Sequence, residues 1–238
     1  MSFNRQSPAP RSEGFGTITH SVFFTIQGEG PFAGRPAVFV RLYGCNLQCP
    51  LCDTDYTSVQ LEWHPDFLSD VVVNAYTAPG RPLVVLTGGE PLRQDLSLLI
   101  SNLQERGCTV QIETNGTQRL SRNTSNGVDY PVAWHDVKIV CSPKTGRVNK
   151  MLERFITAYK YVVIADQVSK EDGLPLTALG HPAHPILARP HKGFPIEKVY
   201  VQPVDPDPDG ANLAACVESC YQFGYTLCLQ QHKIIGVP

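Results

Sequence analysis

Short apolar segments alternate with polar loops along most of the chain. Six of these segments have the length and the Val, Ile, Thr and aromatic content of buried β-strands. They are expected at residues 37–42, 83–87, 109–113, 136–140, 159–165 and 198–202. A strand or hairpin arm is expected ahead of them at 15–26, and a last strand at 225–230.

Helical periodicity is clearest after the second of these strands. Leu96, Leu99, Ile100 and Leu103 fall at i, i+3, i+4 and i+7, and Gly107 follows as a common helix stop. This segment is expected to form a helix.

Other helices are expected between the later strands. One of them ends at Gly224 and uses Cys216 and Cys220 for core packing, and weaker ones are expected at 65–76 and 149–157. The segment 117–135 has no convincing helix, and 166–195 reads as a long loop rich in Pro, Gly and His. The alternation predicts an α/β fold with a parallel sheet and crossover connections.

The composition is that of an ordinary globular protein. Of its 238 residues 42% are hydrophobic and 18% are charged, and the net charge of −2 gives no basic footprint for nucleic acid. Because no apolar run reaches the length of a membrane span or forms the core of a secretory signal, we expect a cytoplasmic protein without a membrane partner. Residues 1–14 are expected to form a disordered N-terminal arm, followed by a single domain over 15–238.

Three cysteines, Cys45, Cys49 and Cys52, lie within eight residues at the spacing C-x3-C-x2-C. In a reducing compartment, cysteines are better interpreted as metal ligands or buried thiols than as disulfides. Thiolates suit zinc, copper(I) and iron–sulfur clusters, and a triad leaves one metal position free for a substrate or cofactor. Gly44 and Pro50 are loop residues, which favours a metal site over three core cysteines. A structural zinc site completed by a distant Cys or His stays open.

Polar or glycine-containing turns follow the carboxyl ends of the expected strands. In a barrel or part-barrel of parallel strands these ends meet on one face, so the turns are expected to converge on one pocket. Arg41 lies beside the first of them and is expected to be either an ion-paired scaffold residue or an anion clamp. The turns are the cysteine loop, 88–91, 113–116, 142–144, 202–205 and the segment around His232.

The cysteine triad and Gly88-Gly89-Glu90-Pro91 together resemble the motifs of the radical S-adenosylmethionine superfamily. Within it, the chain is similar to the 7-carboxy-7-deazaguanine synthase family over residues 15–238. The resemblance implies a single domain with a partial (β/α) TIM-like barrel of about six parallel strands, fewer helices and an N-terminal strand or hairpin arm. The motifs that carry it are Gln27-Gly28-Glu29-Gly30, Arg41, Cys52-Asp53-Thr54, Thr87 to Pro91, Glu113-Thr114-x-Gly116, Ser142-Pro143-Lys144, Gln202-Pro203 and Gln231-His232-Lys233.

The resemblance also implies a reaction. The family converts 6-carboxy-5,6,7,8-tetrahydropterin into 7-carboxy-7-deazaguanine with loss of ammonia, on the route to queuosine and other 7-deazapurines. Its cofactors are a [4Fe–4S] cluster, S-adenosyl-L-methionine and Mg²⁺, and the chemistry is carried by a radical derived from S-adenosylmethionine rather than by a catalytic side chain. The expected partners are the pterin, an electron donor such as flavodoxin or ferredoxin, and a second copy in a homodimer.

By the same resemblance, each group has expected ligands. Cys45, Cys49 and Cys52 would hold the cluster, and Thr54 would bind Mg²⁺, although the residues alone favour a turn hydroxyl for Thr54. Arg41 would pair with the substrate carboxylate as a bidentate fork. The expected substrate-binding residues are Ile26, Gln27, Gly28, Glu29, Arg41, Thr87, His232 and the terminal carboxylate of Pro238. The expected residues for S-adenosylmethionine are Gly88, Gly89, Glu90, Ser142, Pro143, Lys144, Gln202, Pro203, Val204 and Asp205.

Two other functions stay open at this point. A glycyl-radical-enzyme activating enzyme would share the cysteine loop but act on a partner protein, and the Gln27 to Gly30 turn and the ending around His232 favour the pterin instead. A non-enzymatic zinc or iron–sulfur module is the alternative outside radical chemistry. The sequence leaves open the physiological reductant, the role of residues 166–195, and whether the product serves tRNA modification or another deazapurine pathway.

Overall fold

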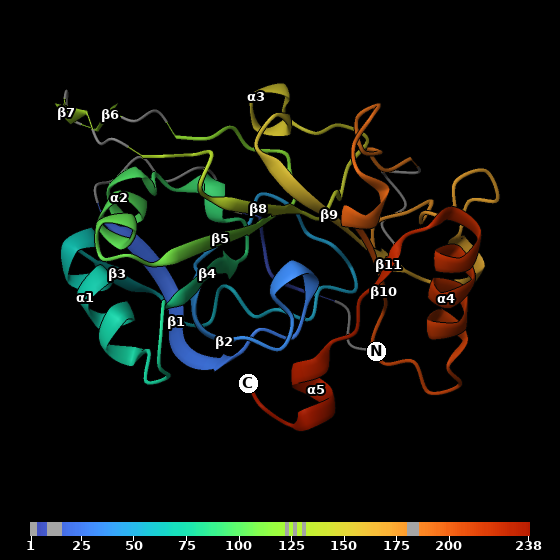
Figure 1. The fold of residues 1–238 in the computed structure, drawn as a ribbon, viewed down its shortest axis with the longest axis horizontal. Helices are drawn as coiled ribbons and strands as arrows, with labels where there is room; N and C mark the ends of the chain where they lie inside the picture. Colours follow the sequence, from blue (N-terminus) through green and yellow to red (C-terminus); the bar gives the residue numbers. More distant parts are fainter. Residues whose placement is uncertain (1–3, 9–15, 122–123, 126–127, 130–131, 180–185) are drawn as a thin grey trace.

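The framework of the protein is a nine-stranded open sheet, shown in Figure 1. The computed structural model describes residues 4–8, 16–121, 124–125, 128–129, 132–179 and 186–238. In these residues the strand order is β11-β10-β9-β8-β5-β4-β2-β1-β3. The parallel part consists of β2 (Pro36–Leu42), β4 (Leu83–Gly88), β5 (Thr109–Thr114), β8 (Lys138–Cys141), β9 (Ile156–Val163), β10 (Val199–Pro203) and β11 (Thr226–Leu227).

An antiparallel arm extends this parallel sheet on one side. Strand β1 (Thr17–Ile26) pairs with β2 so that Phe23 lies opposite Phe39, and β3 (Leu61–Trp63) pairs with the start of β1. A separate hairpin joins β6 (Thr124–Ser125) to β7 (Val128–Asp129). Because the main sheet does not close on itself, the fold is a partial TIM-like barrel with an N-terminal strand arm, as the sequence predicted.

Few helices cover this sheet. Helix α1 (Pro65–Ala75) has proline in its first turn, where a missing N–H costs nothing, and packs against α2 (Ser97–Glu105). Helix α4 (Ala211–Phe223) packs on β10 and ends at Gly224, which adopts the left-handed conformation with φ 78°. The shorter helices are α3 (Lys150–Glu153), α5 (Gln231–Ile235) and the 3-10 turns η1 (Gly30–Phe32), η2 (Pro91–Arg93), η3 (Ala165–Gln167) and η4 (Ile196–Lys198).

The hydrophobic core lies between the sheet and these helices. Side chains of the central strands, such as Val40, Leu86 and Ile112, are fully buried against Leu99 and Leu103 of α2. Continuous apolar runs of this kind are typical of parallel strands that are covered on both faces. The core therefore holds the strands in one register, so that their carboxyl ends form a fixed rim.

Most predicted elements are confirmed, with differences at their ends. The helix predicted over 149–157 is wrong in its second half, because Ile156 and Thr157 already belong to β9 and Ile156 pairs with Ile139 of β8. β-branched residues at that point favour the strand. The strand predicted over 225–230 is limited to the two residues of β11, and α5 follows it.

Of the N-terminal segment that the sequence predicts as a loose arm, the structure describes residues 4–8. Residues 4–8 lie against the cysteine loop, where the backbone N–H of Asn4 donates to the C=O of Pro50 at 2.9 Å. The domain boundary at residue 15 falls outside the described residues and stays a prediction.

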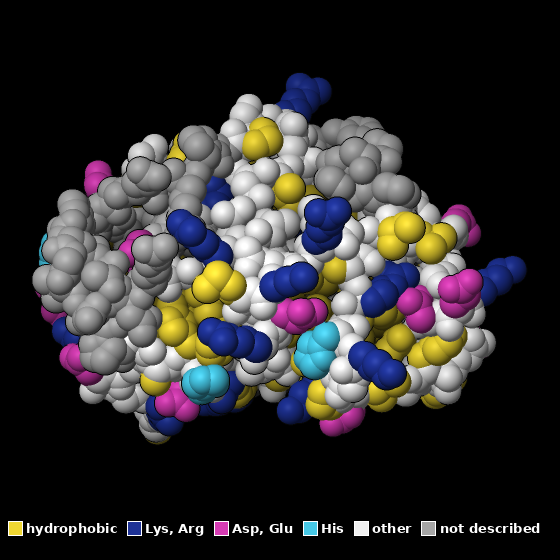
Figure 2. Space-filling view, turned by 90° about the horizontal axis from the view of Figure 1, so that it is seen from above, with side chains coloured by type: hydrophobic (Ala, Val, Ile, Leu, Met, Phe, Trp, Pro, Cys, Tyr) yellow, Lys and Arg dark blue, Asp and Glu magenta, His cyan; other side chains and the backbone are white. Residues whose placement is uncertain are grey.

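Charged side chains of both signs lie on the surface (Figure 2), and the net charge is −2. Figure 2 shows several Lys and Arg side chains, with fewer Asp and Glu among them, on the face seen from above. Among the residues that the structure describes, none of the helices is both long and apolar enough to span a membrane.

Candidate functional site

A cavity of about 390 Å³ opens where the parallel strands end. Its wall includes Arg41 from β2, Thr87 and Gly88 from β4, Glu113 from β5 and Gln202 from β10. The converging loops that the sequence predicted therefore meet at one cavity.

Most of the predicted site residues line this cavity. Five of them do not line it and are buried: Gly28, Glu90, Pro143, Cys45 and Cys49. Those that line it are Ile26, Gln27, Glu29, Arg41, Cys52, Thr54, Thr87, Gly88, Gly89, Ser142, Lys144, Gln202, Pro203, Val204, Asp205, His232 and Pro238.

The cysteine loop is held against the turn after β4. The backbone N–H of Glu90 donates to the C=O of Gly44 at 3.0 Å. A Cβ on Gly89 would lie 2.0 Å from that same carbonyl oxygen, so a larger residue at this position would push the loop away. The loop is fixed on its other side by Asn46, whose side chain accepts a hydrogen bond from Asn115 at 3.1 Å.

The three thiols of this loop lie close enough to influence one another. Burial, together with the neighbouring Cys49 and Cys52, raises the pKa of Cys45 to about 12. Burial also raises the pKa of Cys49 and Cys52, while the Lys144 ammonium acts in the opposite direction on both. Within the described part of the chain, no three His, Cys, Asp or Glu side chains converge as they do around a bound metal ion.

The donor set of this loop fits an iron–sulfur cluster. Three thiols, one of them open to the cavity, share a loop that Gly89 allows to approach closely, and soft sulfur ligands are those that such clusters use. Burial favours the neutral thiols, so binding of iron would have to displace their protons.

Glu90 has a different environment from the one expected of a cofactor ligand. Its carboxylate is fully buried and accepts hydrogen bonds from the Thr114 hydroxyl and the Asn115 N–H, both at 2.7 Å, and from the Leu92 N–H at 3.1 Å. Burial raises its pKa to about 6. In this arrangement Glu90 joins the turns after β4 and β5, and its expected contact with S-adenosylmethionine stays a prediction.

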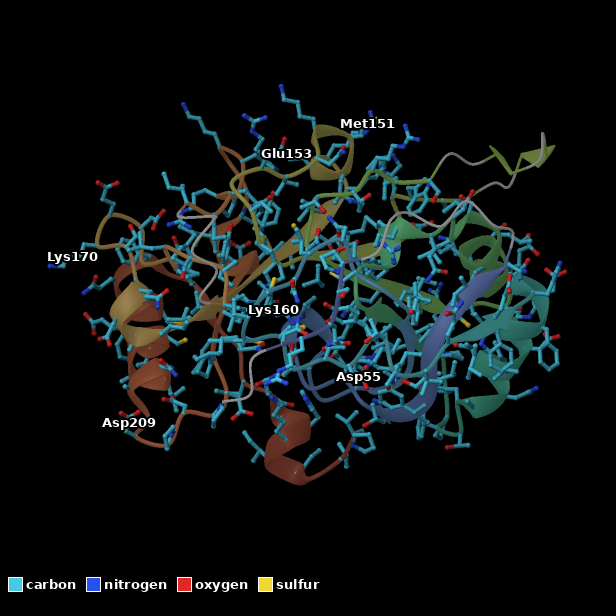
Figure 3. The ribbon with its side chains drawn as sticks, turned by 180° about the vertical axis from the view of Figure 1, so that it is seen from behind. Asp55, Met151, Glu153, Lys160, Lys170 and Asp209 are labelled. Carbon is cyan, nitrogen blue, oxygen red and sulfur yellow. The ribbon has the colours of Figure 1, made fainter. Side chains whose placement is uncertain are left out.

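Lys160 of β9 forms a charge cluster with Glu29 and Glu113 in the wall of the cavity. Its ammonium donates to Glu29 and lies 3.7 Å from Glu113. Figure 3 shows Lys160 near the middle of the molecule, in contrast to Lys170 and Asp209 at the periphery. Although burial alone would lower it, the carboxylates of Glu113 and Glu29 raise the pKa of Lys160. The pKa of Glu29 is lowered because Lys160 outweighs the effect of burial.

Amide side chains complete this cluster. Gln27 and Gln111 each donate to Glu113 at 3.0 Å, while Gln230 donates to Glu29 at 2.8 Å. Two carboxylates against one ammonium leave one negative charge in the buried cluster, and the amides fix its geometry. We call Lys160, Glu29 and Glu113 the charged trio.

Arg41 is another cationic side chain in the wall of the cavity. Its guanidinium lies over the Phe23 ring at 5.2 Å from the ring centroid, and Phe23 stacks on Phe39 at 5.5 Å. Among the described residues Arg41 has no carboxylate within ion-pair distance, which argues against an ion-paired scaffold residue, and its role as an anion clamp stays a prediction. Its planar group is thereby held ready for an acidic ligand.

The C-terminal segment closes the remaining side. Lys233 of α5 donates to Asp53 at 3.0 Å, Asp205 at 2.9 Å and Gln230 at 3.0 Å, which joins the cysteine loop to the turn after β10. This brings His232 to the cavity, where a Cβ on Gly28 would lie 2.1 Å from the His232 Nδ1. The C=O of Pro238 accepts a hydrogen bond from the Thr25 hydroxyl at 2.9 Å.

Sequence reasoning missed several residues of this cavity. Lys160 and Gln230 line it and belong to no motif of the sequence analysis. Asp53, Glu113 and Lys233 line it as well and belong to such motifs, but the sequence assigned them no role in the site. A lone lysine within the apolar run of β9 was the available signal for Lys160. Burying a charge in a strand is costly unless a partner neutralises it.

Known proteins resemble this chain over most of its length. A scan against protein-family models finds no match. The 7-carboxy-7-deazaguanine synthase of Rhodospirillum rubrum is 44% identical over 226 residues, which cover 91% of this chain and 90% of that protein. The 7-carboxy-7-deazaguanine synthase of Rickettsia prowazekii is 35% identical over 228 residues, covering 91% and 87% respectively. The crystal structure of QueE from Escherichia coli matches with a TM-score of 0.66 over 91% of this chain and 94% of that one, at 24% identity, which shows a shared fold.

Proposed function

This chain belongs to the 7-carboxy-7-deazaguanine synthase family, and on that premise we propose that it converts 6-carboxy-5,6,7,8-tetrahydropterin into 7-carboxy-7-deazaguanine with loss of ammonia. The family makes it a radical S-adenosylmethionine enzyme of the lyase class. The observation that supports the substrate assignment is that one cavity wall holds both Arg41, which has no ion-pair partner among the described residues, and the charged trio. A carboxylated pterin has an acidic group at one end and hydrogen-bond donors at the other.

The cysteine-loop end of the cavity is proposed to hold the cofactors. Cys45, Cys49 and Cys52 would bind a [4Fe–4S] cluster, which together with S-adenosylmethionine supplies one-electron chemistry when bound. Gly88 and Gly89 line the cavity beside the loop, and the turns at 142–144 and 202–205 would offer polar groups to the rest of S-adenosylmethionine. Thr54 would supply an oxygen ligand to Mg²⁺.

The other end of the cavity is proposed to bind the pterin. Arg41 would hold its carboxylate through two parallel hydrogen bonds, and Glu29 and Gln27 would accept and donate at the opposite ring edge. Ile26, Thr87, His232 and the carboxylate of Pro238 complete this end. These groups bind and orient the substrate and exclude water, while the reactive chemistry comes from the cofactors.

Anaerobic turnover tests the proposed function. Reconstituted protein, S-adenosylmethionine, Mg²⁺ and a reductant should convert the pterin into 7-carboxy-7-deazaguanine, measured by mass spectrometry. Unchanged pterin in the presence of an intact cluster would contradict the substrate and leave a glycyl-radical-enzyme activating enzyme as the alternative. Zinc without sulfide in the purified protein would instead identify a non-enzymatic module.

Arg41→Lys is expected to weaken pterin binding because an ammonium cannot form the bidentate pair or lie flat on Phe23. We expect the KM for the carboxylated pterin to rise roughly tenfold or more. A rise of this size corresponds to the loss of one charge-assisted hydrogen bond. Iron content should not change. A tetrahydropterin without the 6-carboxylate should inhibit wild type and variant equally. If the variant also bound this analogue more weakly than wild type, Arg41 would not contact the carboxylate.

The partners of the reaction follow from the same proposal. The cluster would receive its electron from a small carrier such as a flavodoxin or ferredoxin, and the protein would act as a homodimer in the cytoplasm. The product would enter queuosine or a related 7-deazapurine.

A further inference from the structure

The segment before the first strand is bonded to the cysteine loop by two amide side chains. The Asn4 amide donates to the C=O of Cys49 at 3.1 Å and to the Tyr56 hydroxyl at 3.3 Å. The Gln6 amide donates to the C=O of Thr54 at 2.8 Å and accepts from the Tyr56 N–H at 2.7 Å. These contacts join parts of the chain that are 45 to 52 residues apart.

Gln6 pairs with the loop in the way a neighbouring strand would. One N–H of its amide donates to the Thr54 carbonyl, and its amide oxygen accepts from the Tyr56 N–H, so it pairs with backbone groups two residues apart in the loop. The same oxygen also accepts from the Thr57 hydroxyl at 3.0 Å. Asn4 supports Gln6 as well, since its side-chain oxygen accepts from the Gln6 backbone N–H at 3.0 Å and from the Gln6 amide at 3.1 Å. Asn4 and Gln6 therefore act as one unit.

The bonded residues alternate with exposed ones. Asn4 and Gln6 are partly buried, whereas Arg5, Ser7 and Pro8 are exposed. Residues in an extended segment alternate between two sides, so this segment presents its amides to the loop and its other side chains to solvent. The segment therefore contacts the cysteine loop through one side only, the side that carries Asn4 and Gln6.

The bonded atoms bracket the groups proposed to bind metal. The carbonyl groups of Cys49 and Pro50 lie between two of the cysteines, and the carbonyl of Thr54 lies two residues beyond Cys52. Tyr56, which both amides contact, is itself buried, and its C=O accepts from the Gly44 N–H at 2.8 Å. Holding Tyr56 therefore fixes both ends of the loop.

We propose that Asn4 and Gln6 are positioning residues that hold the cysteine loop in the shape needed to retain its cluster and to direct Thr54 into the cavity. The proposal rests on the proposed function, because it assigns the cluster to this loop. The amides do not touch the cluster or the substrate; they satisfy loop backbone groups that would otherwise open towards water. Without them the loop would open more often and release iron faster.

The test compares two double variants of the 238-residue protein after anaerobic reconstitution. Asn4→Ala/Gln6→Ala removes both amides, and Arg5→Ala/Ser7→Ala changes the exposed side of the same segment. We expect the first to lose iron to a chelator at least about tenfold faster than wild type, which is the effect of roughly one net hydrogen bond lost from the closed loop. The second should match wild type.

Two further measurements separate this role from a general loss of stability. Gln6→Glu keeps the size of the side chain but cannot donate to the Thr54 carbonyl, and it should also speed iron release. Hydrogen exchange of the cluster-free protein should be faster at the Tyr56 amide in Asn4→Ala/Gln6→Ala, which removes its acceptor, while exchange in β4 and β5 should stay unchanged.

The outcomes distinguish this inference from the proposed function. A wild type that binds no iron–sulfur cluster would overturn the proposed function itself. If the wild type holds a cluster and the amide variants release iron at its rate, with unchanged exchange at Tyr56, the role of Asn4 and Gln6 is overturned. Should the double variant not fold, Gln6→Glu alone gives the same comparison.

Discussion

Replacing Cys49 by alanine is expected to abolish both the cluster and pterin turnover while the protein stays folded. Cys49 is one of only three thiols in the loop, so its loss would leave two protein ligands where a [4Fe–4S] cluster needs three. Its side chain is small, and the loop would still be held by Glu90, Asn115 and the N-terminal amides. Iron and sulfide content, visible absorption and product formation measure the loss.

Cys216→Ala is the matched control for this change. Cys216 is fully buried in α4 and belongs to the core, so its replacement should cost about 1 kcal/mol of the free energy of unfolding without affecting iron content. A Cys49 variant that assembled a full cluster and turned over the pterin would show that the ligand assignment is wrong. Loss of the cluster in the Cys216 variant as well would point to general instability instead.

The sequence predicted those parts of the site that are formed by residues close together in the chain, the cysteine loop and the turn after β4. The spacing of Cys45, Cys49 and Cys52 and the Gly88-Gly89 turn are visible without a fold, because each motif needs its residues at adjacent positions. The strands that carry them were predicted for the same reason, since β2 and β4 are continuous apolar runs. The position of the cavity followed from their parallel order.

Contacts between distant segments could not be predicted in this way. Lys160 is 131 residues from Glu29, and no pattern in either segment indicates the other. Gln6 has an unremarkable polar neighbourhood in the sequence, yet its amide pairs with the loop at Thr54. Such partners are decided by how the strands and turns are brought together, which is a property of the whole sheet.

The motif that contains Glu90 can be recognised in the sequence, but it does not predict all the contacts of this residue. The sequence indicates a carboxylate beside the cofactor, but its burial and its bonds to Thr114 and Asn115 give it a structural task that a motif does not show. Both tasks depend on the same turn after β4.

Lys160→Met is expected to raise the KM for the pterin by about ten- to a hundredfold while leaving iron content unchanged. Without the ammonium, two carboxylates face each other in a buried site, and Glu29 loses the partner that fixes its position. The expected change corresponds to one charge-assisted hydrogen bond to the substrate. Lys160→Arg, which keeps the charge, should recover part of the affinity. Thermal unfolding of both variants shows whether they are folded at the assay temperature.

The pH dependence of this variant separates a role in charge from a role in packing. Two unpaired carboxylates repel, so the pKa of one of them should rise towards neutrality in Lys160→Met. Below that pKa the pair binds one proton and again has a single negative charge, so the KM ratio of variant to wild type should fall as the pH is lowered. The other titratable groups that face the trio are unchanged between the two proteins: Asp53, Lys144, Cys228 and His232. A KM ratio that stays constant with pH, or a KM equal to that of the wild type, would show that Lys160 does not set the charge of the substrate end.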